Sequence, residues 1–450
     1  MFKPEYTMNG LVVQDNMQEN GSLHTRVLRI LLRSHLPALS ATLYALLPAA
    51  LHDRFDKAAS LTQETASLNG GWSCLSTFDM TKKVVVAANA RVFFGSRLSA
   101  SAQFLEAALD YPECLFRTAE ILRLIPSFLH PLVAAMLMRN QSVSETMASY
   151  ISSEIERRRN STSVKNNNQQ QASDCIQFFL DSLPSNSSDR CNSDWPTEKI
   201  VQALLGMWFA AVHQPAMALV YALEDLCSHP KYMDALRREA AYVSASASDS
   251  LPAACTESPV AKTKPKTLYQ TIDSLPCLDA FIRESCRIHP SDSISVRRKV
   301  VSSQDTGEHV GQGFVFKDGT RLLQGDVACV PSQAIMLDPL TYGEDSAEFN
   351  PERFLRHDGG ALTGEKHVKM TAFTELDPSY PIWGLGRHAC PGRHYASLLL
   401  KITLLHAVDK YDLKLGPPGL SKPRKFQFRS SMVPKAQAQI MFRKRRHGEA

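Results

Sequence analysis

Hydrophobic residues along this 450-residue chain recur mainly every three or four positions, the spacing of α-helices that bury one face. Strand-like patterns are few and lie mostly after residue 294. The helices predicted by this spacing cover residues 26–51, 82–94, 142–159, 197–227, 232–243, 275–288 and 393–405. The chain is therefore expected to fold as a mainly α protein with a small β subdomain.

Turn-forming residues between positions 318 and 325 predict a β-hairpin. Asp318, Gly319 and Thr320 have the sequence of a tight turn, and Gly325 follows shortly after. A strand is then expected over residues 327–335.

Two polar segments interrupt the helical pattern. Residues 160–173 are rich in Asn and Gln, and residues 244–266 are rich in Ser, Ala and Pro. Neither carries enough apolar side chains to bury a core of its own, so both are predicted to be mobile surface loops. No linker separates the motifs described below, and residues 1–450 are expected to form a single domain.

The segment 204–223 is apolar enough to be mistaken for a transmembrane helix. His213, Gln214 and Pro215 stand in its middle, where polar groups are expensive to bury in a bilayer. A helix in the core of a globular protein is therefore the favoured interpretation.

Composition and charge exclude some classes of protein. Hydrophobic residues make up 44% and charged residues 21% of the chain, which are ordinary values for a globular protein. A net charge of +5 is too small to indicate a nucleic-acid partner, although a weakly basic face suits an acidic protein partner. Ten cysteines at irregular spacing indicate reduced thiols rather than a disulfide framework.

One of these cysteines, Cys390, stands in a glycine-framed run at residues 383–392, WGLGRHACPG. Gly384 and Gly386 allow backbone conformations that are closed to other residues, and Gly392 allows a close approach to a flat ring. The predicted helix that follows presents its positive end to the sulfur, which favours thiolate over thiol. A loop of this kind presents a cysteine thiolate to haem iron.

A carboxylate and two arginines form a second motif upstream. Glu284 and Arg287 are three residues apart, so they lie on one helix face and can pair. Arg353, in the run NPERF at residues 350–354, can supply a second guanidinium to the same carboxylate. Such a shared carboxylate would lock the polypeptide beneath the haem.

With these motifs in this order, the chain resembles the cytochrome P-450 superfamily. The cysteine loop matches, with Trp383 in place of the usual Phe and His388 in place of the usual Arg. Glu284, Arg287 and Arg353 match the structural triad of that family. The chain is most similar in character to filamentous-fungal members of secondary metabolism, which oxidise terpenoid or alkaloid skeletons.

The resemblance implies haem b as the cofactor, with Cys390 as the axial ligand of the iron. The other residues that it places at the cofactor are Trp383, Gly384, Gly386, His388, Gly392 and Arg298. Arg298 would pair with a haem propionate or, equally, with an acid at the surface. The activity implied is that of a monooxygenase that takes electrons from NADPH through a reductase and oxidises a lipophilic substrate.

The central helix departs from the family. The usual pattern Ala-Gly-x-acid-Thr places Ala211 at the glycine, His213 at the acid and Gln214 at the threonine, so the customary proton-delivering hydroxyl is absent. Gln214 can hold a water instead, and Pro215, which has no N–H, is expected to leave the Ala211 carbonyl free to bind that water. His213 is expected to act either as a proton donor or as a structural histidine.

The resemblance also predicts which residues contact the substrate and which N-terminal segments are missing. Substrate would rest against Ala210, Ala211 and Gln214 and near Ile294 and Met432. Residues 2–8 resemble a sequence that such enzymes carry well inside the chain, so the membrane anchor, the first helix and the first strands are expected to be missing. Family members are expected at the cytosolic face of the endoplasmic reticulum. If the chain truly starts at Met1, it is expected in the cytoplasm.

Other interpretations stay open. A haem-thiolate isomerase or dehydratase needs no proton relay, and a truncated haem-binding remnant would have no turnover. The spacing Gly384-x-Gly386-x-x-Ala389 formally matches a dinucleotide fingerprint, but no βαβ unit surrounds it. Cys286 and His289 are expected to be packing residues rather than half of a metal site, because no second pair stands at zinc spacing.

Overall fold

The computed structural model describes residues 23–61, 71–139, 143–162, 173–182, 196–249, 266–300, 314–358, 367–417 and 425–445. Contacts divide the chain into two compact units. Unit 1 comprises Met1–Asp279, Pro391–Ser421 and Ala436–Ala450, and unit 2 comprises Ala280–Cys390 and Lys422–Lys435. Each unit thus combines segments that are distant in sequence, and the single domain over residues 1–450 stays a prediction.

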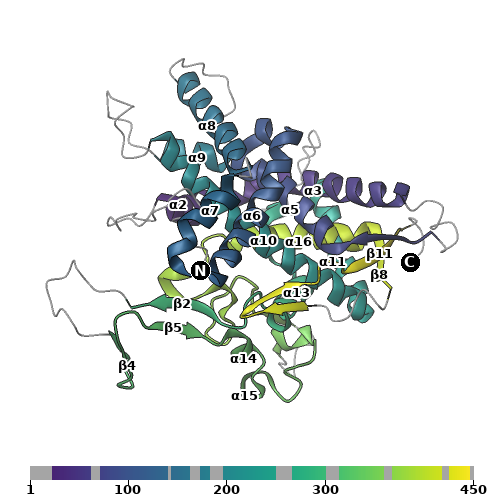
Figure 1. The fold of residues 1–450 in the computed structure, drawn as a ribbon. Coiled ribbons are helices and arrows are strands. Elements are labelled where there is room, and N and C mark those ends of the chain that lie inside the picture. Colours follow the sequence, from purple (N-terminus) through teal and green to yellow (C-terminus); the bar gives the residue numbers. More distant parts are fainter. Residues whose placement is uncertain are drawn as a thin grey trace. The chain divides into compact units, whose positions relative to one another are not determined.

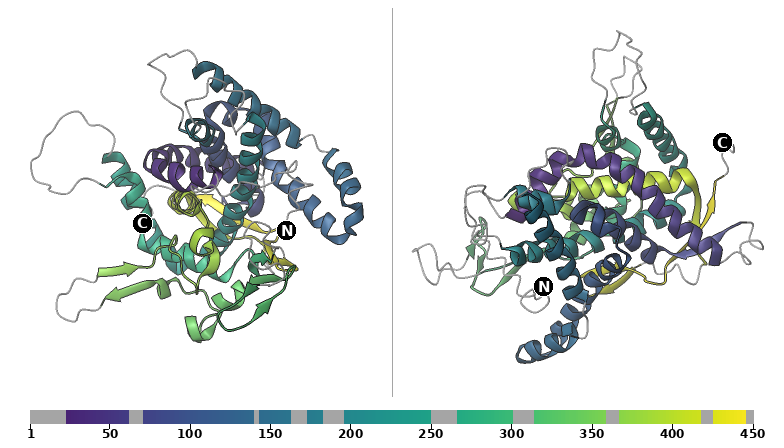
Figure 2. Two further views of the ribbon diagram at one scale, coloured as in Figure 1. Left: turned by 90° about the vertical axis from the view of Figure 1, so that its left-hand side faces the viewer. Right: turned by 90° about the horizontal axis from the view of Figure 1, so that it is seen from above.

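Unit 1 is mainly helical (Figures 1 and 2). Its helices are α2 (Leu23–Arg26), η1 (Val27–Leu32), α3 (Arg33–Leu61), α5 (Thr77–Ser99), α6 (Ala102–Leu124), η2 (Ser127–Leu129), α7 (His130–Arg139), α8 (Val143–Thr162), α9 (Cys175–Asp181), α10 (Thr197–Ser228), η3 (Pro230–Tyr232), α11 (Met233–Asp249), α12 (Leu268–Asp273), α16 (Arg393–Lys410) and the first turn of α13 (Pro276–Ile288). Each helix predicted from the hydrophobic spacing is present. Helix α5 begins earlier than predicted, at Thr77, because the Ser76 hydroxyl accepts a hydrogen bond from the Asp79 N–H and caps it.

Helix α10 is the centre of unit 1 and packs against α5, α6, α8 and α16. Its Trp208 is fully buried, donates from Nε1 to the Ala108 carbonyl at 2.9 Å and contacts the rings of Phe93 and Phe94. The prediction of a core helix over residues 204–223 is therefore confirmed. By length and composition, Val27–Ser60 and Thr197–Ser228 could each cross a membrane, but 61% of the most apolar part of the second is buried inside the protein.

A three-stranded antiparallel sheet completes unit 1. Its strands β1 (Ser73–Ser76), β11 (Gln439–Lys444) and β8 (Tyr411–Leu415) lie in that order. Phe55 of α3 stacks on Tyr411 and meets the edge of Phe442, so this sheet is joined to the helices by an aromatic cluster.

Unit 2 is built from short strand pairs, short helices and the rest of α13. The antiparallel pairs are β2 (Ser295–Lys299) with β5 (Val327–Val330), β3 (Phe314–Val315) with β4 (Arg321–Leu322), β6 (Leu355–Asp358) with β7 (His367–Met370), and β9 (Lys425–Phe428) with β10 (Ser431–Pro434). The helices are α14 (Ser332–Met336), α15 (Pro339–Tyr342), η4 (Pro351–Phe354), η5 (Pro381–Trp383) and η6 (Gly386–His388).

The predicted hairpin forms, and the strand predicted after it is only half right. The Asp318 carboxylate accepts from the Thr320 N–H at 2.9 Å, and Gly319 has a φ of +88°, as a tight turn requires. The strand predicted over residues 327–335 ends at Val330, because Pro331 has no N–H to donate and instead precedes helix α14.

The polar segments are described only at their edges. Helix α8 continues to Thr162 and helix α11 to Asp249, so both helices run into stretches that were predicted to be loops. Most of residues 160–173 and 244–266 lies outside the described residues, as do residues 2–8.

Candidate functional site

The loop that carries Cys390 is fixed by hydrogen bonds within unit 2. The Cys390 N–H donates to the Trp383 carbonyl at 2.6 Å, which closes the loop on itself. The Trp383 indole donates from Nε1 to the Phe373 carbonyl at 2.6 Å, and the two rings meet edge to face. Cys390 itself is half-buried. The hydrogen bond to Trp383 therefore fixes the backbone of a residue that is still partly exposed. His388, which precedes it by two residues, is exposed.

The three predicted glycines of this loop differ in their conformations. Gly384 has φ +68° and ψ −174°, a region open almost only to glycine, and a Cβ there would lie 3.3 Å from the His388 carbonyl oxygen. Gly386 has φ +58° and space around it. Gly392 has an ordinary φ of −88°, and a Cβ there would meet no protein atom within 4 Å. The protein itself therefore requires glycine at the first two positions and not at the third.

Glu284, Arg287 and Arg353 meet in a buried cluster inside unit 2. Arg287 donates from Nε to Glu284 Oε2 at 2.7 Å and from Nη2 to Oε1 at 2.8 Å, and Arg353 Nε lies 3.1 Å from Oε1. The Asn350 N–H also donates to Oε1, at 2.8 Å. Glu284 and Arg287 are fully buried. The carboxylate thus has four hydrogen-bond donors, which compensate for the removal of its charge from water.

The Nη1 atoms of the two arginines connect this cluster to the surrounding segments. Arg287 Nη1 donates to the Met336 and Ser346 carbonyls at 2.6 and 2.7 Å. Arg353 Nη1 donates to the Tyr342 carbonyl at 2.7 Å. Two arginines therefore tie α13, α14 and α15 to the segment that leads into η4.

The strand β2 carries two adjacent arginines with different surroundings. Arg298, the residue predicted at the haem, is exposed, and its Nη1 donates to the Arg297 carbonyl at 2.9 Å. Arg297 is half-buried and donates from Nη2 to the Ser430 hydroxyl. A bulge explains the difference, since Val296 has φ +49° and the pairing with β5 shifts between Ser295 and Arg298. Sequence reasoning missed Arg297, because nothing in the sequence marks this bulge.

The departure from the family pattern lies in α10, in unit 1. Ala210 and Gln214, one helical turn apart, are exposed on a helix whose other residues are mostly buried. Ala211 between them is partly exposed. The helix therefore has one open face, formed by small residues and an amide.

His213 points elsewhere. Its ring lies 6.3 to 6.5 Å, between centroids, from those of Phe78, Phe116 and Phe209. Burial lowers the pKa of His213, and its Nε2 is buried without a hydrogen-bond partner in the part of the chain that the structure describes. These are the surroundings of a packed, neutral imidazole.

The expectation that the Ala211 carbonyl is free was wrong. Asn89 Nδ2 donates to this oxygen at 2.7 Å. Pro215 does leave the carbonyl without its helical donor, but a side chain from α5 takes that place. Asn89 was missed because its position in a helical run gives no sign of what it contacts.

The two outer substrate contacts have opposite burial. Ile294 is 39% exposed, whereas Met432, paired within β10, is fully buried. The Met432 side chain thus packs inside the protein, and the expectation that substrate rests near this loop stays a prediction.

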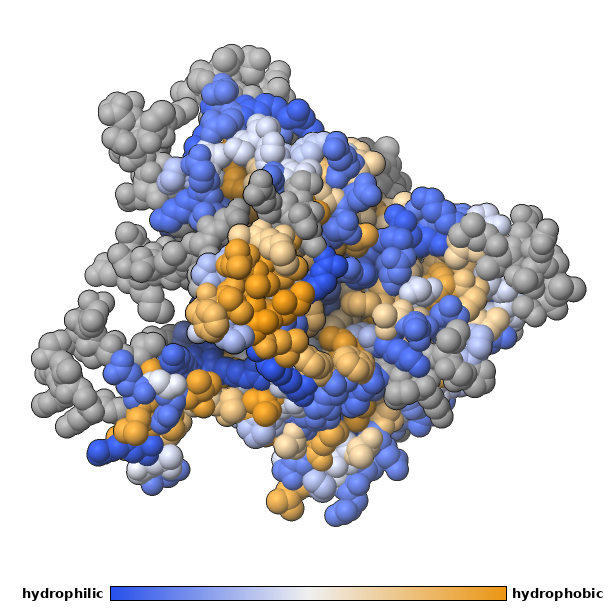
Figure 3. Space-filling view, viewed as in Figure 1, coloured by the Kyte–Doolittle hydropathy of each residue, from blue (hydrophilic) through white to orange (hydrophobic). Residues whose placement is uncertain are grey.

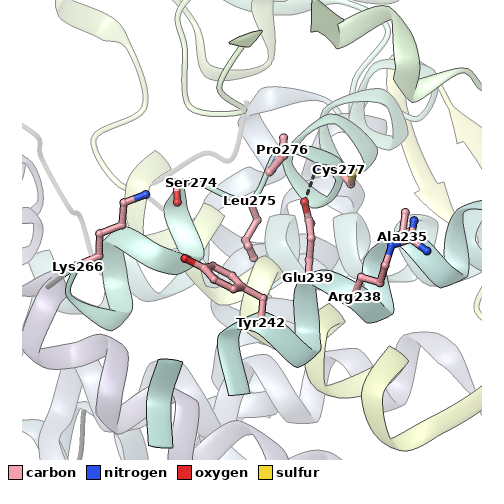
Figure 4. A pocket seen from close by; sticks show the side chains of 9 residues that line it. All are labelled: Ala235, Arg238, Glu239, Tyr242, Lys266, Ser274, Leu275, Pro276 and Cys277. Carbon is pink, nitrogen blue, oxygen red and sulfur yellow. Dashed lines mark hydrogen bonds between the residues drawn. The ribbon is translucent and has the colours of Figure 1, made fainter. Parts of the chain in front are cut away.

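One further hollow, of about 370 Å³, lies in unit 1 beside α11 and α12 (Figure 4). Among its polar lining residues is Glu239, whose carboxylate accepts from the Cys277 and Leu278 N–H groups at 2.8 and 2.9 Å and so caps α13. Burial raises the pKa of Glu239. None of the predicted site residues lines this hollow. Nowhere in the described ranges do three or more His, Cys, Asp or Glu residues gather as a metal site.

The chain is similar to known proteins in sequence and in fold. The Cytochrome P450 family model matches residues 43–442. The chain is 29% identical to cytochrome P450 monooxygenase olcJ of Penicillium canescens, over 96% of this chain and 72% of that protein. It is 26% identical to the ent-kaurene oxidase of Gibberella intermedia, over 99% of this chain and 73% of that protein. The fold is similar to the crystal structure of the cytochrome P450DA haem domain, with a TM-score of 0.63, 16% identity and coverage of 99% of this chain and 83% of that one.

Proposed function

The chain belongs to the cytochrome P450 family, and from this premise we propose a haem-thiolate monooxygenase that inserts one atom of O2 into a lipophilic fungal secondary metabolite. The observation that carries the proposal is Cys390, a half-buried thiol at the end of a loop that glycine conformations and the Trp383 carbonyl hold in place. A cysteine that is only half-buried, on a backbone held by hydrogen bonds, suits an axial ligand of haem iron.

The residues present fit a haem. Cys390 would bind the iron, and Arg297 and His388 would pair with propionates. Arg297 replaces Arg298 in this proposal because it is the half-buried member of the pair. A thiolate-ligated haem supplies the two-electron activation of O2 that such an insertion needs.

For the open face of α10, in unit 1, a role in handling oxygen is proposed. Ala210 and Ala211 leave room there for small molecules, and the exposed Gln214 amide can hold a water by donating from its NH2 group or accepting at its oxygen. Gln214 would thereby deliver protons through water, in place of a hydroxyl. His213 is left out of this chemistry, because its ring is packed among aromatic rings and its pKa is lowered by burial.

The electrons are proposed to come from NADPH through a reductase, and the substrate to be a terpenoid or alkaloid skeleton. Similarity to the ent-kaurene oxidase of Gibberella intermedia supports a terpenoid-type substrate. The weakly basic net charge of +5 suits an acidic redox partner.

The protein is further proposed to work at the cytosolic face of the endoplasmic reticulum. Figure 3 shows hydrophobic side chains gathered over α7. Leu124, Phe128, Leu132 and Met136, spaced four residues apart from the end of α6 through α7, are 65%, 78%, 72% and 59% exposed. An exposed apolar stripe of this kind suits the surface of a bilayer.

The test is the reduced carbon monoxide difference spectrum of the purified protein. We expect a Soret band at the thiolate position, and we expect Cys390→Ala to abolish this band and substrate oxidation together. Absence of haem uptake, a band of imidazole ligation, or activity that survives in Cys390→Ala would each contradict the proposal.

A second candidate is a haem-thiolate isomerase or dehydratase. It is favoured by Gln214 and Pro215, which stand where the family carries its hydroxyl, because a rearrangement needs no proton relay. Turnover that proceeds without O2 and NADPH would select this candidate, whereas strict dependence on both selects the monooxygenase.

A further inference from the structure

The open face of α10 contains a break in the helical hydrogen-bond ladder. In a regular α-helix the N–H of residue 215 would donate to the carbonyl of residue 211. Pro215 has no N–H, so the Ala211 carbonyl has no donor within the helix. The break lies one residue from Ala210 and three from Gln214, the two exposed residues of this face.

A side chain from another helix fills the break. Asn89 of α5 is fully buried, and its Nδ2 donates to the Ala211 carbonyl at 2.7 Å. The other end of the same amide, Oδ1, accepts from the Tyr395 hydroxyl at 2.7 Å. The orientation of the amide is unambiguous, because a carbonyl oxygen only accepts and so must face the NH2 group.

Tyr395 anchors this amide from a third helix, α16. Its ring is 6% exposed and meets the edge of Phe93. Burial raises the pKa of Tyr395 well above its ordinary value, which favours the protonated hydroxyl that donates to Asn89. The chain of donors therefore runs in one direction, from Tyr395 to Asn89 to Ala211.

We propose that Asn89, held by Tyr395, is a positioning residue that replaces the hydrogen bond lost at Pro215 and fixes the part of α10 that presents Gln214. The inference rests on the proposed function, because it assigns to Asn89 the task of keeping the proton-delivering amide in place. A buried asparagine that served only to satisfy its own polar atoms would not depend on whether residue 215 is a proline.

This dependence gives the experiment. Asn89→Leu removes both hydrogen bonds, and Asn89→Leu/Pro215→Ala returns an N–H that can donate to the Ala211 carbonyl within the helix. Hydrogen exchange of the purified holoprotein, read by mass spectrometry on peptides from residues 205–220, measures how readily this part of α10 opens. We expect exchange about tenfold faster in Asn89→Leu, the effect of leaving a buried carbonyl unpaired, and a return to within about twofold in the double variant.

Tyr395→Phe and Tyr395→Phe/Pro215→Ala repeat the comparison with the amide retained, and they decide the matter if Asn89→Leu does not fold. We expect a smaller acceleration, about threefold, that Pro215→Ala again reverses. Unchanged exchange in Asn89→Leu, or acceleration that Pro215→Ala leaves in place, would overturn the proposal.

Electron use links the local opening to the reaction. We expect Asn89→Leu to lower the share of NADPH electrons that reach product several-fold, with the remainder released as peroxide, and Pro215→Ala to restore part of that share.

The proposed function and the role of Asn89 can be tested separately. A missing thiolate band with intact exchange rescue overturns the proposed function, whereas a normal band without rescue overturns the role of Asn89.

Discussion

Two glycines of the cysteine loop differ in the reason for which glycine is expected there. One is required by the backbone conformation, and the other by the space that a bound haem would occupy. Gly384 has a conformation closed to other residues, with the His388 carbonyl close by, whereas Gly392 has an ordinary conformation and open space. We expect Gly384→Ala to destabilise the loop by about 1 to 3 kcal/mol and to lower haem retention. Unfolding in urea and the haem content per protein measure the two effects.

Gly392→Ala is the matched variant. We expect it to unfold at the same urea concentration as the parent, because no protein atom lies within 4 Å of the new methyl group. Loss of haem binding without loss of stability would then report a close approach of the ring to this residue. Equal destabilisation by both substitutions would contradict this division of roles.

Single residues were the least predictable level of the site. The sequence indicated Cys390 with Gly384 and Gly386, because such a loop needs backbone conformations that favour glycine. It did not distinguish Arg297 from Arg298, because the bulge at Val296 depends on pairing with a distant strand. It gave Asn89 no role, because hydrogen bonds between helices depend on packing rather than on local spacing.

The α13 cluster makes the next prediction, at the level of elements. Glu284→Gln keeps the size of the side chain but leaves the buried Arg287 guanidinium and the partly buried Arg353 guanidinium without their shared charge. We expect a loss of about 3 to 5 kcal/mol in the free energy of unfolding, with loosening of unit 2. Asp345→Asn is the control, since Asp345 also pairs with Arg353 but its side chain is 43% exposed, and an unchanged unfolding midpoint is expected there. A stable Glu284→Gln protein would contradict the structural role of the cluster.

A second ion-pair cluster, in unit 1, gives a prediction for pH. Burial alone would raise the pKa of Glu154, but hydrogen bonds from Arg157, Arg158 and Arg97 outweigh it and lower the pKa to about 2. The folded value lies below the ordinary 4.5, so the stabilisation is complete above pH 4.5 and is lost as pH falls toward 2. We expect this group to contribute about 3 kcal/mol to the resulting loss of stability. Glu154→Gln should flatten the pH dependence of the unfolding free energy in that window, and an unchanged slope would contradict the assignment.

Helices were predictable and their neighbours were not. Long helices such as α10 are predictable from the spacing of their apolar residues. Helices α8 and α11 were also predicted, although they extend a few residues beyond their predicted C-terminal ends. Helix α6 was missed, although it is 23 residues long. The strand predicted over residues 327–335 failed at Pro331, where the absence of a backbone N–H outweighed the apolar pattern.

On the scale of the whole molecule, the family and the mainly α fold were predictable because the motifs between Glu284 and Cys390 stand in the order that the family has, and because helical spacing recurs along the rest of the chain. The division into two compact units was not, since each unit joins segments that are far apart in sequence. Hydrophobic spacing reports which face of an element is buried and carries no information on which distant segment buries it.

The exposed stripe of η2 and α7 supports the last prediction. Its large apolar side chains are mostly exposed. Their transfer from water into the edge of a bilayer would be favourable by about 25 cal/mol for each Å² of apolar surface buried. We expect the purified protein to co-sediment with phosphatidylcholine vesicles, and Phe128→Ser/Leu132→Ser to bind at least about tenfold more weakly with unchanged unfolding. Leu340→Ser is the matched control, since this side chain is 97% exposed but belongs to unit 2, and its binding should equal that of the parent. Vesicle binding that is insensitive to the double substitution would place the membrane contact elsewhere and leave the stripe without this role.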